Sequence, residues 1–240
     1  MEFILCENYN EMSIKAAKII ESQIRKNPKS VLGLATGSTP IGMYNELSRM
    51  YREEGLDFSE ITSVNLDEYY PIAPENINSY KYFMDDNLFN HVNINKANTH
   101  LPKGSAEDAD AECRAYDELI KSTGGISIQV LGIGENGHIG FNEPADELVS
   151  GTHMVELTES TINANARNFD SADDVPRHAL TMGMASIMSA EKIILLISGK
   201  KKHFALKKLL DDKINTNVPA TLLKLHKDVV VLYDKEAYEG

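Results

Sequence analysis

Short apolar runs alternate along the chain with longer segments in which apolar residues recur at helical spacing. This alternation predicts an α/β fold of three layers, with a mostly parallel, Rossmann-like central sheet that carries helices on both faces. The runs that predict strands span residues 3–6, 31–34, 62–66, 126–133, 192–197 and 229–233. The helical patterns span 11–26, 40 to about 50, 105–121 with Ser105 as the expected N-cap, and 201–210.

The runs at 126–133 and 193–197 lack the alternation of apolar and polar residues that is typical of a strand with one solvent-exposed face. They should therefore lie in the middle of the sheet. No low-complexity linker or fixed-period repeat interrupts the pattern, which predicts one domain over residues 1–240. Residues 158–176 differ, because they are rich in Asn, Ser and Asp and have little apolar periodicity. We expect this stretch to form a polar surface lid.

The composition of the chain restricts the classes of partner that the protein is expected to bind. Hydrophobic residues make up 42% of the chain and charged residues 25%, as in ordinary globular proteins. The net charge of −12 opposes binding to nucleic acid and to anionic membrane surfaces, so neither is expected as a partner. The longest strongly apolar run, 193–197, is too short to span a bilayer, and no basic signal segment is visible. Cys6 and Cys113 lie far apart and are expected to be buried thiols in a reducing cytoplasm.

Ligands of open α/β sheets bind beyond the carboxyl ends of the strands, and four such ends carry unusual residues here. After the strand at 31–34, Gly37 lets the backbone approach a ligand, and Ser38 and Thr39 add hydroxyls. The helix that opens at Pro40 adds free N–H groups and a positive dipole end. These features predict an anion cradle, typically for phosphate. A plain strand-to-helix turn with capping hydroxyls is the alternative.

The strand at 62–66 runs directly into two adjacent acids, Asp67 and Glu68. If the strand conformation continues, their side chains point to opposite faces, so at most one of them faces the cleft. Asp67 directly follows the apolar region, which predicts a buried carboxylate with a shifted pKa, suited to act as a general base. A solvated acid in a loop is the alternative.

A glycine-rich block follows the next strand and contains the spacing Gly-x-Gly-x-x-Gly. In dinucleotide-binding folds this spacing opens a helix, but Gly140 and Pro144 break any helix here, so no dinucleotide is expected. The block instead predicts a tight turn that holds His138 near Asn136 and Glu143. Because the Glu143 carboxylate can fix the imidazole tautomer, His138 is an acid–base candidate. A structural or exposed histidine is the alternative.

The fourth strand end carries three consecutive lysines, 200–202, in an otherwise acidic protein. We expect at least one of them to touch an anion and Arg167, from the polar lid, to close over the same anion; a solvated helix start is the alternative. The histidines include no pair at metal-ligand spacing and no Cys-x-x-Cys occurs, so no metal or other cofactor is expected. Neither a nucleophile elbow nor a P-loop motif is present.

Taken together, these stretches resemble the glucosamine-6-phosphate deaminases of the glucosamine/galactosamine-6-phosphate isomerase family. The matching blocks follow the family's order over nearly the whole chain and span 36–40, 65–69, 79–80, 132–144, 164–167 and 198–202. The resemblance implies an amino-sugar-degrading enzyme that isomerises an aldose to a ketose without a metal and releases ammonia. Its substrate would be a small sugar phosphate, glucosamine 6-phosphate, and its products fructose 6-phosphate and ammonium.

The resemblance also implies residue roles. His138 would open the sugar ring, oriented by Glu143 and Asn136, and Asp67 would move a proton between carbon-2 and carbon-1. Imidazole titrates near neutral pH, as ring opening requires, and enolisation needs a desolvated carboxylate. The substrate phosphate would be held by Gly37, Ser38, Thr39, Arg167 and Lys202.

Three departures from the family pattern matter. Many members carry Asp where this chain has Asn136, which accepts a hydrogen bond but brings no negative charge. Effector-regulated members carry hydroxyls and cations where this chain has Asp146, Glu147 and residues 153–155, so we expect no activation by N-acetylglucosamine 6-phosphate. The chain also ends at Gly240, earlier than the regulated hexamers, which favours a monomer.

Two other functions stay open. A 6-phosphogluconolactonase-type hydrolase shares the scaffold and a Gly-His turn, but Asp67 and the continuation 141–144 favour the deaminase. A non-catalytic sugar-phosphate sensor of the bacterial-regulator type needs a DNA-binding module of roughly 50–60 residues. The first strand begins near Phe3, which leaves no room for such a module. A stand-alone binder would have little use for Asp67, His138 and Glu143 together.

Overall fold

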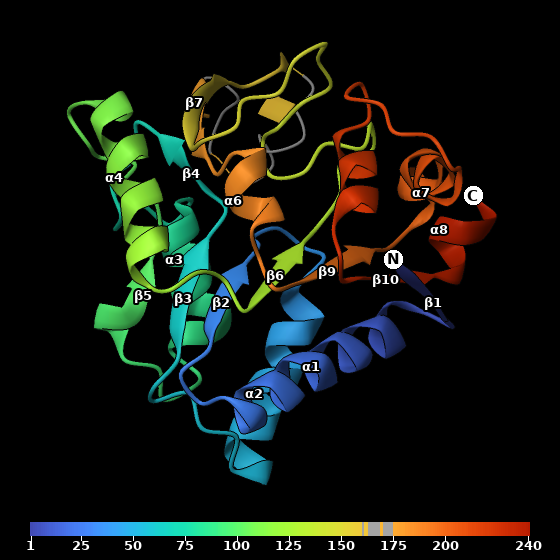
Figure 1. Ribbon diagram of the computed structural model, residues 1–240. Coiled ribbons are helices and arrows are strands. Elements are labelled where there is room, and N and C mark those ends of the chain that lie inside the picture. The colour runs from blue at the N-terminus through green and yellow to red at the C-terminus, as the bar shows by residue number, and fades with distance from the viewer. Residues whose placement is uncertain (160, 163–168, 170–174) are drawn as a thin grey trace.

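A seven-stranded sheet forms the middle layer of the computed structural model, which describes residues 1–159, 161–162, 169 and 175–240 (Figure 1). Its strands run in the order β1-β10-β9-β6-β2-β3-β5, and all neighbours pair in parallel. The strands are β1 Glu2–Cys6, β2 Val31–Leu34, β3 Thr62–Asn65, β5 Thr99–His100, β6 Ile128–Leu131, β9 Lys192–Ile197 and β10 Val229–Asp234. The predicted parallel central sheet is confirmed.

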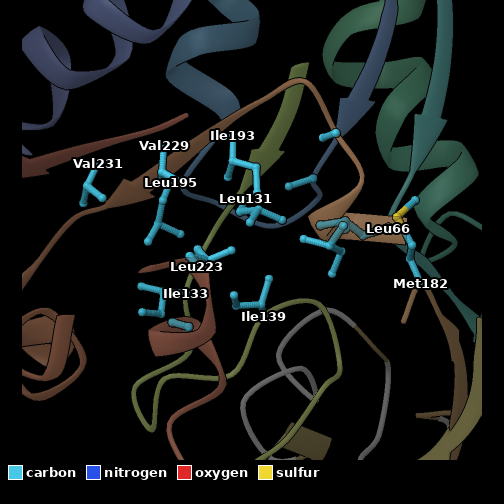
Figure 2. Close-up of a cluster of buried hydrophobic side chains, with 14 of the residues drawn as sticks. Leu66, Leu131, Ile133, Ile139, Met182, Ile193, Leu195, Leu223, Val229 and Val231 are labelled. Atoms are coloured by element: carbon cyan, nitrogen blue, oxygen red, sulfur yellow. The ribbon is translucent and has the colours of Figure 1, made fainter. Parts of the chain in front are cut away.

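Helices cover both faces of this sheet, as predicted (Figure 1). They are α1 Tyr9–Lys26, α2 Ile41–Glu54, α3 Tyr80–Met84, α4 Ala109–Ser122, α6 Met184–Met188, α7 His203–Leu210 and α8 Lys235–Glu239. In β9, Ile193 and Leu195 join one core while Ile194 and Leu196 join the other, because strand side chains alternate between faces. The first core, part of which Figure 2 shows, packs against α4, α6 and α7, and the second packs against α1 and α2.

Shorter helical turns complete the described part of the chain. A π-helical turn, Asp85–Phe89, continues α3, and 3₁₀ turns span Lys96–Asn98, Lys200–Lys202 and Pro219–Leu225. The turn at Lys200–Lys202 leads directly into α7, so the lysine run lies between β9 and that helix.

The N-cap predicted for α4 at Ser105 is wrong. The helix begins at Ala109, and the Asp108 carboxylate caps it by accepting the Ala111 N–H at 2.9 Å. Ser105 instead belongs to a turn in which the Ala106 N–H donates to the Lys103 carbonyl. A carboxylate is the stronger cap because its charge also complements the helix dipole.

A second, three-stranded antiparallel sheet has the order β4-β8-β7, with β4 Asp67–Tyr70, β8 His178–Thr181 and β7 His153–Glu156. Leu66 connects the two sheets, since its N–H donates to the Leu34 carbonyl and its carbonyl accepts the Met182 N–H at 2.6 Å. The hydrophobic pattern does not predict β7 or β8, because each contains only two apolar residues, flanked by polar or charged ones.

The predicted lid lies mostly outside the described residues. Of 158–176, the structure describes 158–159, 161–162, 169 and 175–176. Ile162 and Val175 are buried in a third apolar cluster with Tyr69 and Phe141, next to the small sheet. Cys6 and Cys113 are buried free thiols, as predicted. In the described part of the chain, no helix has both the length and the apolar character needed to cross a membrane.

Candidate active site

The four strand ends with candidate residues are neighbours at one edge of the central sheet. β9, β6, β2 and β3 are adjacent and parallel, so their carboxyl ends lie side by side. The segments that follow them are 200–202, 132–144, 35–40 and, through Leu66, β4. The topology therefore brings together segments that are far apart in the sequence.

The segment 132–144 folds back on itself and presents the imidazole of His138. The Gly134 N–H donates to the His138 carbonyl at 3.0 Å, which closes the turn. The ring lies over Gly134 so closely that a Cβ on that residue would stand 2.3 Å from His138 Cε1. Only glycine tolerates this approach, which explains why the sequence has glycine there.

His138 and Glu143 meet across the turn. Nδ1 of His138 lies 3.1 Å from Glu143 Oε1, an ion-pair distance, although the alignment falls short of a hydrogen bond. With Nδ1 facing the carboxylate, Nε2 is the nitrogen that can exchange a proton with a ligand. The Asn136 side chain holds the turn rather than the ring. Its Oδ1 accepts the main-chain N–H of His138 at 3.1 Å, and its Nδ2 donates to Glu143 Oε2 at 2.7 Å.

The Glu143 carboxylate is held in its ionised form. Burial opposes ionisation, but contacts with His138, Asn136 and Thr161 outweigh it and hold the pKa of Glu143 below its ordinary value. The Thr161 hydroxyl donates to Glu143 Oε1 at 3.4 Å and lies 2.9 Å from the Thr158 hydroxyl. Sequence reasoning missed Thr161; the pair of threonines three apart, a helix-capping spacing, is the local signal.

Asp67 is the first residue of β4 and is only 6% exposed. Burial raises the pKa of Asp67 to about 8, and the neighbouring Glu68 carboxylate adds to the rise. Asp67 is therefore a buried strand residue and not a solvated loop acid.

Asp67 lies against the loop that carries His138. It pairs in register with Thr181 of β8, and the Thr181 hydroxyl accepts the Phe141 N–H at 3.1 Å. A Cβ on Gly140 would stand 3.5 Å from Asp67 Oδ2 and 3.0 Å from Thr181 Oγ1. Because Gly140 follows His138 by two residues, the Asp67 carboxylate lies against the loop that carries the imidazole.

The segment 35–40 connects β2 to α2 at this edge. Gly37 has a φ of +90°, in the left-handed region that favours glycine. Gly37 and Ser38 are exposed and Thr39 is half-buried, so all three are accessible to a ligand.

The amino end of α2 adds main-chain donors to this segment. α2 starts at Ile41 without a side-chain cap of its own, which leaves N–H groups of its first turn available. The Tyr9 hydroxyl takes one of them, accepting the Gly42 N–H at 2.8 Å, and donates to the Ser38 carbonyl at 3.1 Å. Sequence reasoning missed Tyr9 because only the tertiary packing of α1 against α2 brings it here.

Of the three consecutive lysines, Lys202 is the one turned toward the protein. Lys200 and Lys201 are exposed, and Lys201 Nζ lies 3.6 Å from Glu135 Oε1. Lys202 is half-buried, and burial lowers its pKa. Arg167, the other predicted cation, lies outside the described residues.

The described ranges contain no group of three or more His, Cys, Asp or Glu side chains placed to hold a metal ion. What they place at one sheet edge is an imidazole–carboxylate pair, a buried acid with a raised pKa, a glycine-hydroxyl loop and a half-buried lysine. This set suits proton transfer on an anionic ligand.

Comparison with known proteins identifies the family of this chain. The family model of glucosamine-6-phosphate isomerases/6-phosphogluconolactonase matches residues 8–232. The chain belongs to this family. The resemblance predicted from the sequence blocks is thereby confirmed. A glucosamine-6-phosphate deaminase of Halothermothrix orenii is 56% identical over 237 residues, which cover 99% of this chain and 98% of that protein. One from Clostridium perfringens is 54% identical with the same coverage.

Solved structures share the fold. A monomeric glucosamine-6-phosphate deaminase matches with a TM-score of 0.97 at 48% identity, covering 100% of this chain and 99% of that one. The 6-phosphogluconolactonase of Thermotoga maritima matches with a TM-score of 0.75 at 20% identity, covering 97% of this chain and 98% of that one. The second likeness shows the fold alone, whereas the first extends to the sequence.

Proposed function

We propose that this protein is a glucosamine-6-phosphate deaminase that converts glucosamine 6-phosphate and water to fructose 6-phosphate and ammonium. The observation that carries the proposal is full-length identity of more than half to deaminases, and it is supported by an Asp67 carboxylate that lies against the loop of the His138–Glu143 pair. By analogy with the monomeric deaminase of the same fold, the protein acts as a monomer.

His138 opens the sugar ring. It takes the proton of the anomeric hydroxyl and delivers a proton to the ring oxygen, so the bond between carbon-1 and the ring oxygen breaks and the aldehyde forms. Glu143, 3.1 Å from Nδ1, stabilises the imidazolium that arises between the two transfers. Asn136 holds both residues, through the His138 main chain and the Glu143 carboxylate.

Asp67 carries the isomerisation. It removes the proton from carbon-2, which gives an enol-type intermediate, and returns it to carbon-1, which leaves a ketose imine. Water hydrolyses the imine and ammonium departs. A carboxylate whose pKa is about 8 holds the carbon-2 proton more strongly than an ordinary carboxylate does, so its burial supports this role.

The phosphate lies over the segment 35–40 and the lysine run. Main-chain N–H groups and hydroxyls of Gly37, Ser38 and Thr39 bind it together with the ammonium group of Lys202. The resemblance assigns Arg167 to the same phosphate. The charge of the phosphate supplies binding energy far from the reacting carbons and orients the sugar between Asp67 and His138.

A 6-phosphogluconolactonase activity is the alternative, since lactonases share the fold. The test is one purified protein with two substrates and no added metal or nucleotide. We expect ammonium release from glucosamine 6-phosphate and no hydrolysis of 6-phosphogluconolactone. Lactone hydrolysis without ammonium release would overturn the proposal, and binding of both sugars without turnover of either would identify a sensor.

A further inference from the structure

We propose that Glu68 is a positioning residue for Asp67, acting from the face of β4 that the substrate does not reach. The inference rests on the proposed role of Asp67 as the base. Glu68 fixes the strand that presents Asp67, and its negative charge makes the neighbouring carboxylate a stronger base.

Glu68 is clamped by the main chain on several sides. Its Oε1 accepts the N–H of Tyr69 at 2.9 Å and of Tyr80 at 2.8 Å, and its Oε2 accepts the N–H of Lys81 at 2.9 Å. Tyr80 and Lys81 are the first residues of α3, whose opening N–H groups have no partner inside the helix. The carboxylate therefore joins β4 to α3, and at 2% exposure it has little freedom to move.

Glu68 and Asp67 face opposite sides of β4. Asp67 lies against Gly140, in the loop of His138, whereas the Glu68 side chain lies against Gly104, where a Cβ would stand 3.0 Å from Glu68 Cγ. On that side Glu68 lines a cavity of about 320 Å³, with an apolar wall that includes Leu101. Because the two side chains point apart, Glu68 acts on the reaction through Asp67 and not by touching the sugar.

The groups around the two acids set their charges. Those on the Glu68 side are Lys81, which is paired with Asp85, and His100, Lys103, Glu112 and Tyr116. Those near Asp67 are Glu68, Tyr80 and Tyr116, with no cation among the described residues that act on it.

The surroundings of Glu68 and Asp67 favour ionisation to different degrees. Burial raises the pKa of Glu68 to about 7, against the pull of its main-chain N–H donors and Lys81. Burial raises the pKa of Asp67 to about 8, and the charge of Glu68 adds to it. Because three main-chain N–H groups stabilise the ionised form of Glu68, Glu68 carries the negative charge of the pair, and that charge makes Asp67 hold a proton more firmly.

The test is Glu68→Gln, which removes the charge and keeps the size of the side chain. We expect the acidic limb of the kcat/KM profile to move to lower pH, because Asp67 loses the neighbouring charge. We also expect kcat to fall about tenfold, because a weaker base accepts the carbon-2 proton less readily, with KM for glucosamine 6-phosphate nearly unchanged. The matched control is Glu112→Gln, an acid of the same cavity that lies away from Asp67, and its profile should match that of the wild type.

A direct titration separates this inference from the proposed function. The ¹³C carboxyl resonance of Asp67, assigned by its loss in Asp67→Asn, should titrate at lower pH in Glu68→Gln whether or not the protein releases ammonium. An unchanged Asp67 titration in Glu68→Gln would overturn the inference, whereas absence of ammonium release with the shifted titration would overturn only the proposed function.

Glu68→Asp tests whether Glu68 positions Asp67, and it is the variant to measure if Glu68→Gln does not fold. The shorter side chain keeps the charge but reaches fewer N–H groups of α3, so the acidic limb should stay within about half a pH unit of wild type while kcat falls several-fold. Wild-type kcat in Glu68→Asp would show that the clamp does not position Asp67.

Discussion

Asp67 and Glu143 are both carboxylates at the same edge of the sheet, yet their surroundings drive them in opposite directions. Asp67 is buried in β4 beside another acid, and its pKa rises to about 8. Glu143 lies in the glycine-rich loop among His138, Asn136 and Thr161, and its pKa falls below the ordinary value. The same edge of the sheet thus carries one acid whose protonated form is favoured and one whose ionised form is favoured.

The difference between the two carboxylates fits the two proton transfers of the proposed mechanism. In the proposed mechanism, ring opening needs an imidazole next to a fixed negative charge, and Glu143 is placed 3.1 Å from His138 Nδ1 to provide it. The proposed enolisation needs a strong base shielded from water, and the buried Asp67 carboxylate fits that requirement. Environments that shift the pKa values of similar groups in opposite directions indicate different roles for those groups. Substituting each group should therefore give a different kinetic defect.

The largest expected effect comes from Asp67→Asn. It removes the proposed base, so ammonium release should fall by about 10³–10⁴-fold and isotope exchange at carbon-2 should vanish, while sugar phosphate binding stays nearly intact. Proton NMR in deuterated water measures the exchange. The control is Asp212→Asn, an exposed acid beyond α7. Normal turnover by Asp67→Asn would show that the base lies elsewhere.

A smaller and selective effect is expected from His138→Gln. Turnover of the closed ring should fall by about 10²-fold, because the substitution removes the proton carrier for ring opening but leaves Asp67 in place. The open-chain fraction present at mixing should still react in a fast initial phase of a stopped-flow ammonium assay. His91→Gln, at an exposed histidine, serves as control. Equal slowing of both phases would contradict the assignment to ring opening.

A milder change, Asn136→Asp, tests whether the amide keeps Glu143 ionised. Asn136 Nδ2 donates to Glu143 Oε2 at 2.7 Å, and a second carboxylate at this distance would force the pair to share a proton. We expect the acidic limb of the kcat profile to move up by about one pH unit, with less than about a tenfold change in maximal rate. An unmoved limb would mean that the amide does not govern the charge of Glu143.

The smallest effect concerns stability. Because the pKa of Asp67 rises from 3.8 to about 8 on folding, the acid does not lower the free energy of unfolding below about pH 4, where it is protonated in both the folded and the unfolded state. The loss of unfolding free energy grows as pH increases from 4 to 8 and then levels off. Asp67→Asn should therefore gain a few degrees in Tm over wild type at pH 8 and much less at pH 5. A gain that is equal at both pH values would rule out the buried charge as its cause.

Much of this site could be predicted from local patterns. The apolar run before Asp67 predicts a strand that buries it, and the glycine spacing around His138 predicts the tight turn that the chain forms. The polar contacts could not be predicted. Asn136 bonds Glu143 rather than the imidazole, and Tyr9 reaches Ser38, because hydrogen-bond geometry depends on where folded segments meet. The cap predicted at Ser105 was wrong for a local reason, because the Asp108 carboxylate caps α4 three residues further along the chain.

By itself, the sequence determined the layered sheet and the segments that bear the chemistry, because hydrophobic period, glycine and strand ends are local properties. Only the tertiary structure decided which of these segments come together at one sheet edge. The order β9-β6-β2-β3 brings distant strand ends together, and Leu66 leads the chain from one sheet into the other, so that Asp67 faces the loop of His138 and Glu68 faces away. Desolvation and neighbouring charge follow from that packing, and they raise the pKa values of Asp67 and Glu68 above those of ordinary acids.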